Sequence, residues 1–172
     1  MKKIISIVLS TSLLLLACQP KETKTEQVQL PRQTGVTVDS SANISMVLKT
    51  FEAVNNMDSA AIRSYYIDTA KVNDNSTPMT IEKNISMMSN FKKAGLIMHA
   101  DVSKIIIFEM ITPKPDPIFG NTDYVHSYLP VTFKKGEKSV NTLLHGVFAI
   151  QDGKIKTEWD IYDASGIPDL MK

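Results

Sequence analysis

The hydrophobic pattern of this chain changes its period once, and that change constrains the fold more than any other feature. Between about residues 42 and 95, apolar residues recur at spacings of three and four, as they do on one face of a helix. From Met98 onwards they alternate with polar residues, as in strands with one buried face. Helices followed by antiparallel strands predict an α+β domain whose helices pack on one side of a curved sheet.

Three helices are predicted in the first part, and each starts near a residue that makes a good N-cap. Asp58 precedes the second helix and Thr80 the third, while Gly95 ends the third. The expected spans are 42–55, 59–67 and a third helix from Ile81. The stretch 72–78 is expected to be a loop.

Four strands are predicted in the second part, joined as an antiparallel meander. Their expected spans are 98–110, 124–134, 140–151 and 154–163. A proline-rich loop separates the first two strands, and the dipeptides Lys135-Gly136 and Asp152-Gly153 predict tight turns between the others.

The last turn fixes an expected register between the final two strands. If Asp152-Gly153 is a two-residue turn, Gln151 lies opposite Lys154, and counting back places His145 opposite Asp160. Both side chains then share one face of the sheet. There the aspartate could orient the imidazole, and the imidazole could act as a general base near neutral pH.

The same counting places further polar rings on this face. His126 or Tyr128 lies beside His145 on the preceding strand, and Tyr162 follows Asp160 by two residues on the last strand. The opposite face collects the apolar residues Val125, Leu129, Val131, Phe133, Leu144, Phe148, Ile150, Ile155, Trp159 and Ile161. Two interpretations of the polar face stay open. It is the floor of a pocket, or it is the solvent side that antiparallel sheets often have.

The first 17 residues have the order of a secretory signal, with two lysines before an apolar run. The run is shorter than the about 20 residues that cross a bilayer. Its ending Leu15-Leu16-Ala17-Cys18 resembles the lipobox of bacterial lipoproteins, which implies cleavage before Cys18 and acylation of that residue with palmitate-like chains. The alternatives are a secreted protein cut near Ala17 and an uncleaved anchor.

The predicted organisation is a signal peptide at 1–17, a lipidated cysteine and flexible tether at 18–41, and one domain at 42–172. A short strand around 36–38 that pairs with the domain is the alternative for the end of the tether. We expect a protein anchored by lipid in the bacterial cell envelope, at the outer membrane or the periplasmic face, without crossing the membrane. Cys18 is the only cysteine, so no intramolecular disulfide can form.

The closing segment Trp159-Asp160-Ile161-Tyr162-Asp163, with Gly166 after it, resembles the SnoaL-like branch of the nuclear transport factor 2 superfamily. The segment 44–54 resembles that family's opening helix, and Met57-Asp58 resembles its turn into the second helix. The resemblance implies a cone of three helices over a curved sheet, an apolar pocket and often a dimer packed through the sheets. It also implies that Asp160 faces the pocket, although the strands lack the arginine of the epoxide-hydrolase arrangement.

Composition and spacing exclude several classes of partner and site. Without the two leader lysines, 17 Lys and Arg residues face 18 Asp and Glu, and no basic stripe occurs, so nucleic acid is not an expected partner. The three histidines lack metal-ligand spacing and no cofactor motif is present, so we expect neither a metal nor a cofactor. Glu109, Glu158 and Asp163 could join a carboxylate pair, but solvation at strand edges is the simpler interpretation.

Three functions remain open on the sequence. The first is binding of a small apolar or amphipathic ligand by a membrane-tethered domain. The second is a cyclase, isomerase or hydratase that uses Asp160 and His145 as an acid–base pair, with hydrogen-bond donors among Tyr65, Tyr66 and Tyr128. The third is a non-catalytic envelope module that engages another protein or a second copy through its sheet.

Overall fold

The computed structural model describes residues 35–115, 117, 118 and 120–172. The predicted signal peptide, Cys18 and most of the predicted tether lie outside the described residues. The elements are, in chain order, β1 (Val36–Val38), α2 (Ala42–Asn56), α3 (Ser59–Ser64), β2 (Tyr66–Asp74), β3 (Thr77–Thr80), α4 (Ile81–Lys93), β4 (Ile97–Ala100), the 3-10 turn η1 (Val102–Lys104), β5 (Ile106–Ile111), β6 (Asp123–Lys135), β7 (Lys138–Gln151), β8 (Lys154–Ile161) and α5 (Ile167–Met171). No helix in these ranges is long and apolar enough to cross a membrane.

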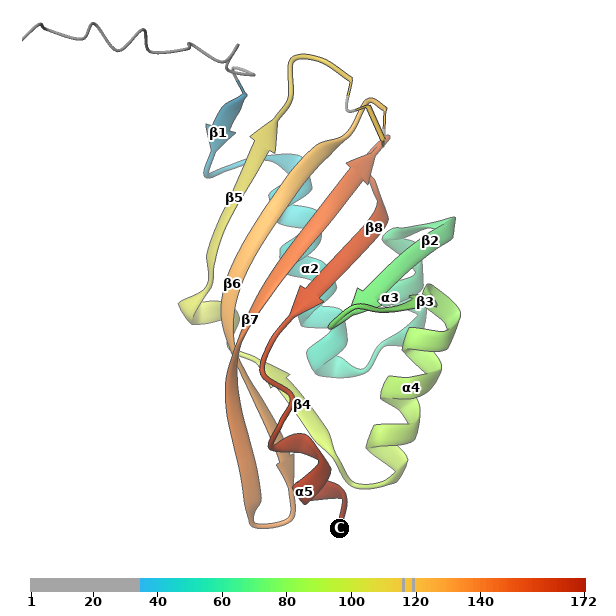
Figure 1. The fold of residues 1–172 in the computed structure, drawn as a ribbon, viewed down its shortest axis with the longest axis vertical. Coiled ribbons are helices and arrows are strands. Elements are labelled where there is room, and N and C mark those ends of the chain that lie inside the picture. The colour runs from blue at the N-terminus through green and yellow to red at the C-terminus, as the bar shows by residue number, and fades with distance from the viewer. Residues whose placement is uncertain (1–34, 116, 119) are drawn as a thin grey trace, which may run out of the picture. The chain divides into compact units, whose positions relative to one another are not determined.

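The strands of the described region form one curved sheet. Its order is β1-β5-β6-β7-β8-β2-β3, and β4 pairs with the far end of β6. All neighbouring pairs are antiparallel except β2 and β8, which are parallel. Figure 1 shows α2 behind the long strands β6 and β7, with α3 and α4 beside β2 and β3. The predicted α+β class, with helices on one side of a mainly antiparallel sheet, is confirmed.

The helices begin where side-chain caps are available. Ser41 accepts a hydrogen bond from the Ile44 amide at 3.0 Å and starts α2. The predicted caps Asp58 and Thr80 accept from the amides three residues ahead and start α3 and α4. Met57 ends α2 in the left-handed conformation, with a φ of 53°, which turns the chain sharply into α3.

The core lies between α2 and the inner face of the sheet. The Phe51 ring of α2 meets the Phe148 ring of β7 edge to face, with centroids 5.7 Å apart. Eight of the ten residues predicted for the apolar face are buried there: Val125, Leu129, Val131, Phe133, Leu144, Phe148, Ile150 and Ile155. We call the side of the sheet that bears them the inner face.

The region after the second helix differs from its prediction. The expected helix 59–67 ends at Ser64, and the expected loop 72–78 is instead a hairpin of β2 and β3. Asn75 and Ser76 form its two-residue turn, both with positive φ. β2 gains most of its pairing from β8, more than 80 residues later, and local sequence carries no sign of such a partner.

The expected strand 98–110 is two strands, β4 and β5, separated by η1. The interruption faces Pro130 of β6, which has no amide hydrogen to donate to a neighbouring strand. Its carbonyl accepts from the Asp101 amide at 2.9 Å, where β4 ends. The alternative considered for residues 36–38 is confirmed, because β1 pairs with β5.

Candidate functional site

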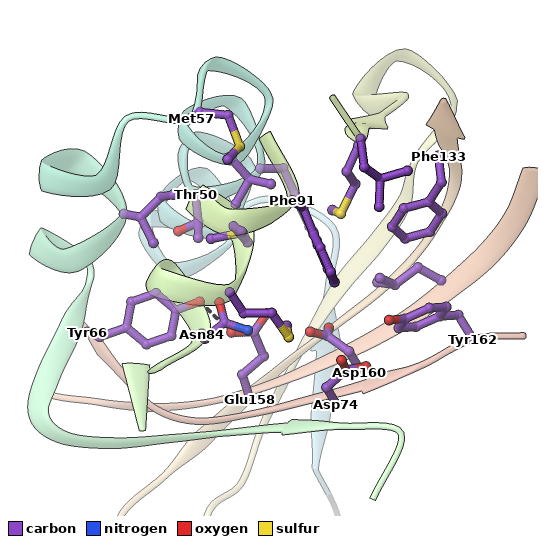
Figure 2. A pocket seen from close by; sticks show the side chains of 18 residues that line it. Thr50, Met57, Tyr66, Asp74, Asn84, Phe91, Phe133, Glu158, Asp160 and Tyr162 are labelled. Carbon is purple, nitrogen blue, oxygen red and sulfur yellow. Dashed lines mark hydrogen bonds between the residues drawn. The ribbon is translucent and has the colours of Figure 1, made fainter. Parts of the chain in front are cut away.

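A pocket lies between the helices and the inner face of the sheet (Figure 2). The volume open to the centres of water-sized molecules is about 80 Å³, and one water needs roughly 10–15 Å³ on this measure. The pocket therefore has room for a small organic group. Its walls are lined by Thr50, Phe51, Val54, Met57, Ile62, Asn84, Met87, Met88, Phe91, Leu96, Met98, Phe133 and Leu144.

The walls are mainly apolar and adaptable. Four of the lining residues are methionines, whose unbranched side chains can fit ligands of different shape. Met87 and Met88 come from α4, Met57 from the end of α2, and Met98 from β4. Such walls suit an apolar ligand or the apolar part of an amphipathic one.

The floor is acidic and is built by the parallel pairing of β2 with β8. This pairing sets Asp74 beside Asp160, and Glu158 lies two residues earlier on the same face of β8. Tyr66 at the start of β2 and Tyr162 after β8 complete the floor. Figure 2 shows Asp74 and Asp160 close together, with Glu158 and Tyr66 to one side.

Glu158 is a buried carboxyl group, only 8% exposed. The Tyr66 hydroxyl donates a hydrogen bond to its Oε2. Burial raises the pKa of Glu158 to about 7; hydrogen bonds from Tyr66 and Asp160 counteract this in part, and the nearby charge of Asp74 adds to it. Glu158 can therefore gain or lose a proton near neutral pH.

Asp160 is a second buried carboxyl group of the floor that holds its proton more tightly than an ordinary aspartate does. Burial raises the pKa of Asp160 well above its ordinary range, and repulsion from Glu158 and Asp74 and a hydrogen bond with Glu158 raise it further. A hydrogen bond between two carboxyl groups needs a proton on one of them, so Glu158 and Asp160 share protons as a pair.

The two tyrosines act as donors to this acidic floor. The hydroxyl of Tyr162 donates to Asp74, and burial followed by the charge of Asp74 raises the pKa of Tyr162. Burial and then the charge of Glu158 raise the pKa of Tyr66. One oxygen each of Asp74 and Asp160, the Oδ1 atom, is buried without a hydrogen-bond partner in the described region.

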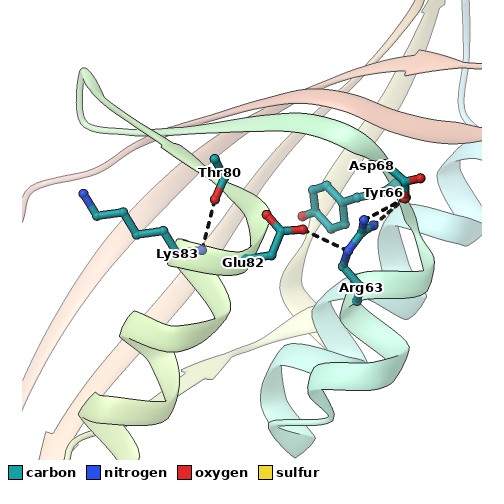
Figure 3. Close-up of polar contacts among 6 residues, drawn as sticks. All are labelled: Arg63, Tyr66, Asp68, Thr80, Glu82 and Lys83. Carbon is teal, nitrogen blue, oxygen red and sulfur yellow. Dashed lines mark hydrogen bonds and ion pairs between the residues drawn. The ribbon is translucent and has the colours of Figure 1, made fainter.

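None of the residues that line the pocket is Lys, Arg or His. The nearby Arg63 is engaged outside it (Figure 3): it pairs with Asp68 at 2.8 Å and Glu82 at 3.1 Å, and it donates to the carbonyl of Tyr66 at 3.1 Å. The three carboxyl groups of the floor therefore have no cationic partner among the lining residues. This agrees with the missing arginine noted in the sequence.

The predicted pairing of His145 with Asp160 is wrong. The turn at Asp152-Gly153 forms as expected, but a bulge follows, and Ala149 pairs with Thr157 while Ile150 pairs with Ile155. The extra residue, Lys156, shifts the register by one, so His145 lies opposite Ile161. A shift of one residue exchanges the faces of a strand, which sends Asp160 into the pocket and leaves His145 on the other side.

His126, Tyr128 and His145 lie on the outer face of the sheet, away from the pocket. Their rings stack across β5, β6 and β7 with Phe108: centroids are 4.3 Å apart for Tyr128 and His145, 6.0 Å for His126 and His145, and 5.1 Å for Phe108 and His126. His145 Nε2 is buried without a hydrogen-bond partner in the described ranges. The prediction of these rings as pocket floor is therefore wrong.

The bulge also moves two residues that were expected on the apolar face. Trp159 pairs with Val147 and Ile161 with His145, so both lie on the outer face. Of the remaining candidates, Tyr66 and Tyr162 line the pocket, whereas Tyr65 packs beside the core without lining it.

Two members of the floor differ from the simplest prediction. Asp74 is expected in a loop but lies in β2. Glu158 is not solvated: it pairs with Asp160, two residues away on the same face of β8, as the alternative of a carboxylate pair allows. Glu109 was also interpreted as solvated, but it is 2% exposed and accepts from Asn43 Nδ2 at 2.6 Å. Asp163 is exposed, as expected.

Neither a family model nor a curated protein matches this chain. Solved structures do match its fold. An LEH-like epoxide hydrolase of M. tuberculosis is 14% identical, with a TM-score of 0.56 over 78% of this chain and 92% of that one. TerC, co-crystallised with polyporic acid, is 14% identical, with a TM-score of 0.57 over 76% of this chain and 98% of that one.

A third similar structure is a proposed polyketide cyclase of Xanthomonas campestris, 10% identical, with a TM-score of 0.56 over 76% of this chain and 97% of that one. Identities this low establish the fold alone. The described domain has the nuclear transport factor 2-like fold that the sequence resemblance implied.

Proposed function

We propose that this protein binds a small apolar or amphipathic ligand in the pocket beneath its helices. The observation that supports the proposal is an apolar cavity with a polar, acidic floor. Ligand sites in proteins commonly combine such walls with a few polar groups that orient the ligand. The similar structure that was crystallised with polyporic acid supports the idea that this fold can hold an organic molecule.

The proposed place of action is the bacterial cell envelope, with the domain tethered through a lipidated Cys18. This part of the proposal is based on the leader and the lipobox-like ending in the sequence. Incorporation of labelled palmitate into the wild-type chain and its absence in a Cys18→Ala variant would test it. Labelling of both chains, or of neither, would contradict the anchor.

Ligand binding can be tested with cyclohexylmethanol and the purified full-length chain. Leu144 is a wall of the pocket, and Leu143 beside it is 59% exposed on the outer face. We expect Leu144→Trp to fill the pocket and to weaken binding in calorimetric titrations by tenfold or more, while Leu143→Trp binds as the wild type does. Met88→Trp, on α4, is a second variant in which a larger side chain fills the pocket. Equal binding by all four chains, or by none, would reject the pocket as the site.

The second candidate function is acid–base catalysis on the bound molecule. The observation that favours it is the proton-sharing pair of Glu158 and Asp160, because a pKa near 7 suits a group that must both accept and donate protons. In this role Asp160 donates to an oxygen of the substrate while Glu158 accepts a proton from water. His145, on the outer face, has no part in the pair.

Hydration of cyclohexene oxide to its diol is a direct assay for this candidate. Water adds to one carbon of the ring, the carbon–oxygen bond breaks, and Asp160 protonates the leaving oxygen. We expect Glu158→Gln and Asp160→Asn to reduce any turnover at least a hundredfold, with exposed Glu137→Gln as the matched control. Turnover that persists unchanged in both pocket variants would exclude this activity, and so would a wild type that shows no turnover.

We also propose that the outer face of the sheet pairs with a second copy of the chain. Ile106, Leu143 and Ile161 on this face are 66%, 59% and 58% exposed. A twofold axis brings a surface against itself, so a surface without net charge suits such a contact. The central outward positions carry no Asp, Glu, Lys or Arg side chain: Ile106, Phe108, His126, Tyr128, Leu143, His145, Val147, Trp159 and Ile161.

A further inference from the structure

We infer that the ligand of this pocket carries a protonated amine, held by the acidic floor, on a compact apolar body held by the methionine-rich walls. The inference rests on the proposed ligand-binding function and names the chemical class of the ligand. An amphipathic organic ammonium ion is the class that matches both parts of the pocket.

The floor of the pocket carries acidic groups without a basic partner among the lining residues. Asp74, Glu158 and Asp160 come together in one cavity, and no basic residue lines it. Carboxyl groups that are buried together without a cation repel one another, and each proton they release leaves an uncompensated charge. A ligand that brings a positive charge removes this repulsion, whereas an anionic ligand would add to it.

Two individual oxygens of the floor are available to a ligand. Asp74 Oδ1 and Asp160 Oδ1 are buried with no hydrogen-bond partner in the part of the chain that the structure describes. Both belong to residues that line the pocket and lie close together at its floor (Figure 2). Unpaired buried acceptors are unfavourable, and an ammonium group has three donors to offer them.

The walls of the pocket suit an organic cation better than a metal ion. The described residues contain no group of His, Cys, Asp and Glu side chains arranged to hold a metal ion. The pocket above the floor is walled by methionines, phenylalanines and leucines, which contribute nothing to a hydrated ion but pack against hydrocarbon. The walls therefore favour a cation with an apolar body.

The proposal carries a pH dependence that can be checked. The titratable groups that face the pocket are Tyr66, Asp74, Glu158, Asp160 and Tyr162, and the helices and other strands contribute uncharged side chains. Because Glu158 loses its proton around pH 7, the floor becomes more negative above that pH. An alkylamine stays protonated up to about pH 10, so its binding should tighten from pH 5.5 to pH 8.5.

The test compares three compounds of similar size and shape: cyclohexylmethylamine, cyclohexylmethanol and cyclohexanecarboxylate. Their dissociation constants for the full-length chain are measured by calorimetry or ligand-observed NMR at pH 8.5 and 5.5. We expect the amine to bind at least tenfold more tightly than the alcohol at pH 8.5, with the carboxylate weakest. Asp160→Asn and Asp74→Asn should bring the ratio of amine to alcohol affinity towards one, while Asp169→Asn, an exposed carboxylate, leaves it unchanged.

The outcomes distinguish this inference from the proposed function. If the alcohol binds and the amine binds no better, the pocket is a ligand site but the ammonium class is wrong. If the amine is preferred equally by wild type and by the Asp160→Asn and Asp74→Asn variants, the preference arises elsewhere on the surface and the inference fails. If none of the three compounds binds, the proposed function fails and the inference fails with it.

Discussion

Replacing Glu158 with glutamine should flatten the dependence of stability on pH. Burial raises the pKa of Glu158 in the folded chain to about 7 from an ordinary value of 4.5. An acid whose pKa is raised by folding stabilises the fold fully below its unfolded pKa, and this contribution is lost as pH rises through the folded pKa. The wild type should therefore lose stability between about pH 4.5 and 7.

The magnitude follows from the difference between the two pKa values, which is about 2.5. Each pKa unit corresponds to 1.36 kcal/mol, so the loss due to Glu158 is about 3 kcal/mol. Glutamine has no proton to lose but keeps an oxygen that can accept from Tyr66. Removing the glutamate charge also relieves the repulsion on Asp160, and this acts in the same direction.

Urea unfolding followed by circular dichroism, at pH values from 4.5 to 8, measures this effect. Across this pH range the free energy of unfolding should decrease in both chains, and the decrease should be about 3 kcal/mol larger in the wild type than in Glu158→Gln. The matched control is Glu137→Gln at the exposed turn between β6 and β7, which should follow the wild type. Parallel curves for the wild type and Glu158→Gln would refute the assignment of a buried, titrating carboxyl group at the pocket floor.

Three further predictions concern the core and the outer face. Phe148→Ala removes a fully buried ring from the core and should cost about 3–5 kcal/mol of unfolding free energy; a loss below about 1 kcal/mol would contradict its central position. In Gly146→Ala the new methyl group would lie 2.8 Å from Ser127 Oγ and 2.9 Å from the Phe148 ring, so thermal denaturation should reveal a loss of about 1–3 kcal/mol, and unchanged stability would contradict this crowding. Leu143→Glu should convert a dimer to a monomer in sedimentation experiments, and a monomeric wild type would exclude pairing through the outer face.

Local patterns predicted much of the fold. The caps Asp58 and Thr80 and the turn Asp152-Gly153 lie where the sequence placed them, because each depends on residues within a few positions. β2 could not be predicted in the same way, because it depends on β8, more than 80 residues later. Elements that depend on distant partners leave weak local signals.

The candidate site depended on one residue that sequence counting could not detect. Lys156 is the extra residue in β8, and nothing in its type marks it as a bulge. Counting without the bulge pairs Asp160 with the outer-face histidine and places Glu158 on that same outer face. The family resemblance implies a pocket position for Asp160 from its place in a motif, but combined with the uncorrected register it also favoured the wrong face for His126, Tyr128 and His145.

The central claim is that the methionine-rich pocket over the acidic floor binds a small organic ligand. Methyl NMR of a chain labelled at the methionine methyl groups tests it most directly, because Met57, Met88 and Met98 line the pocket. Met110 lies on β5, between β1 and β6, and is not a lining residue. On titration with cyclohexylmethanol, the account predicts saturable shifts of the pocket methyl signals and an unchanged Met110 signal. Shifts confined to Met110, or no saturable shift of any pocket methionine, would contradict it.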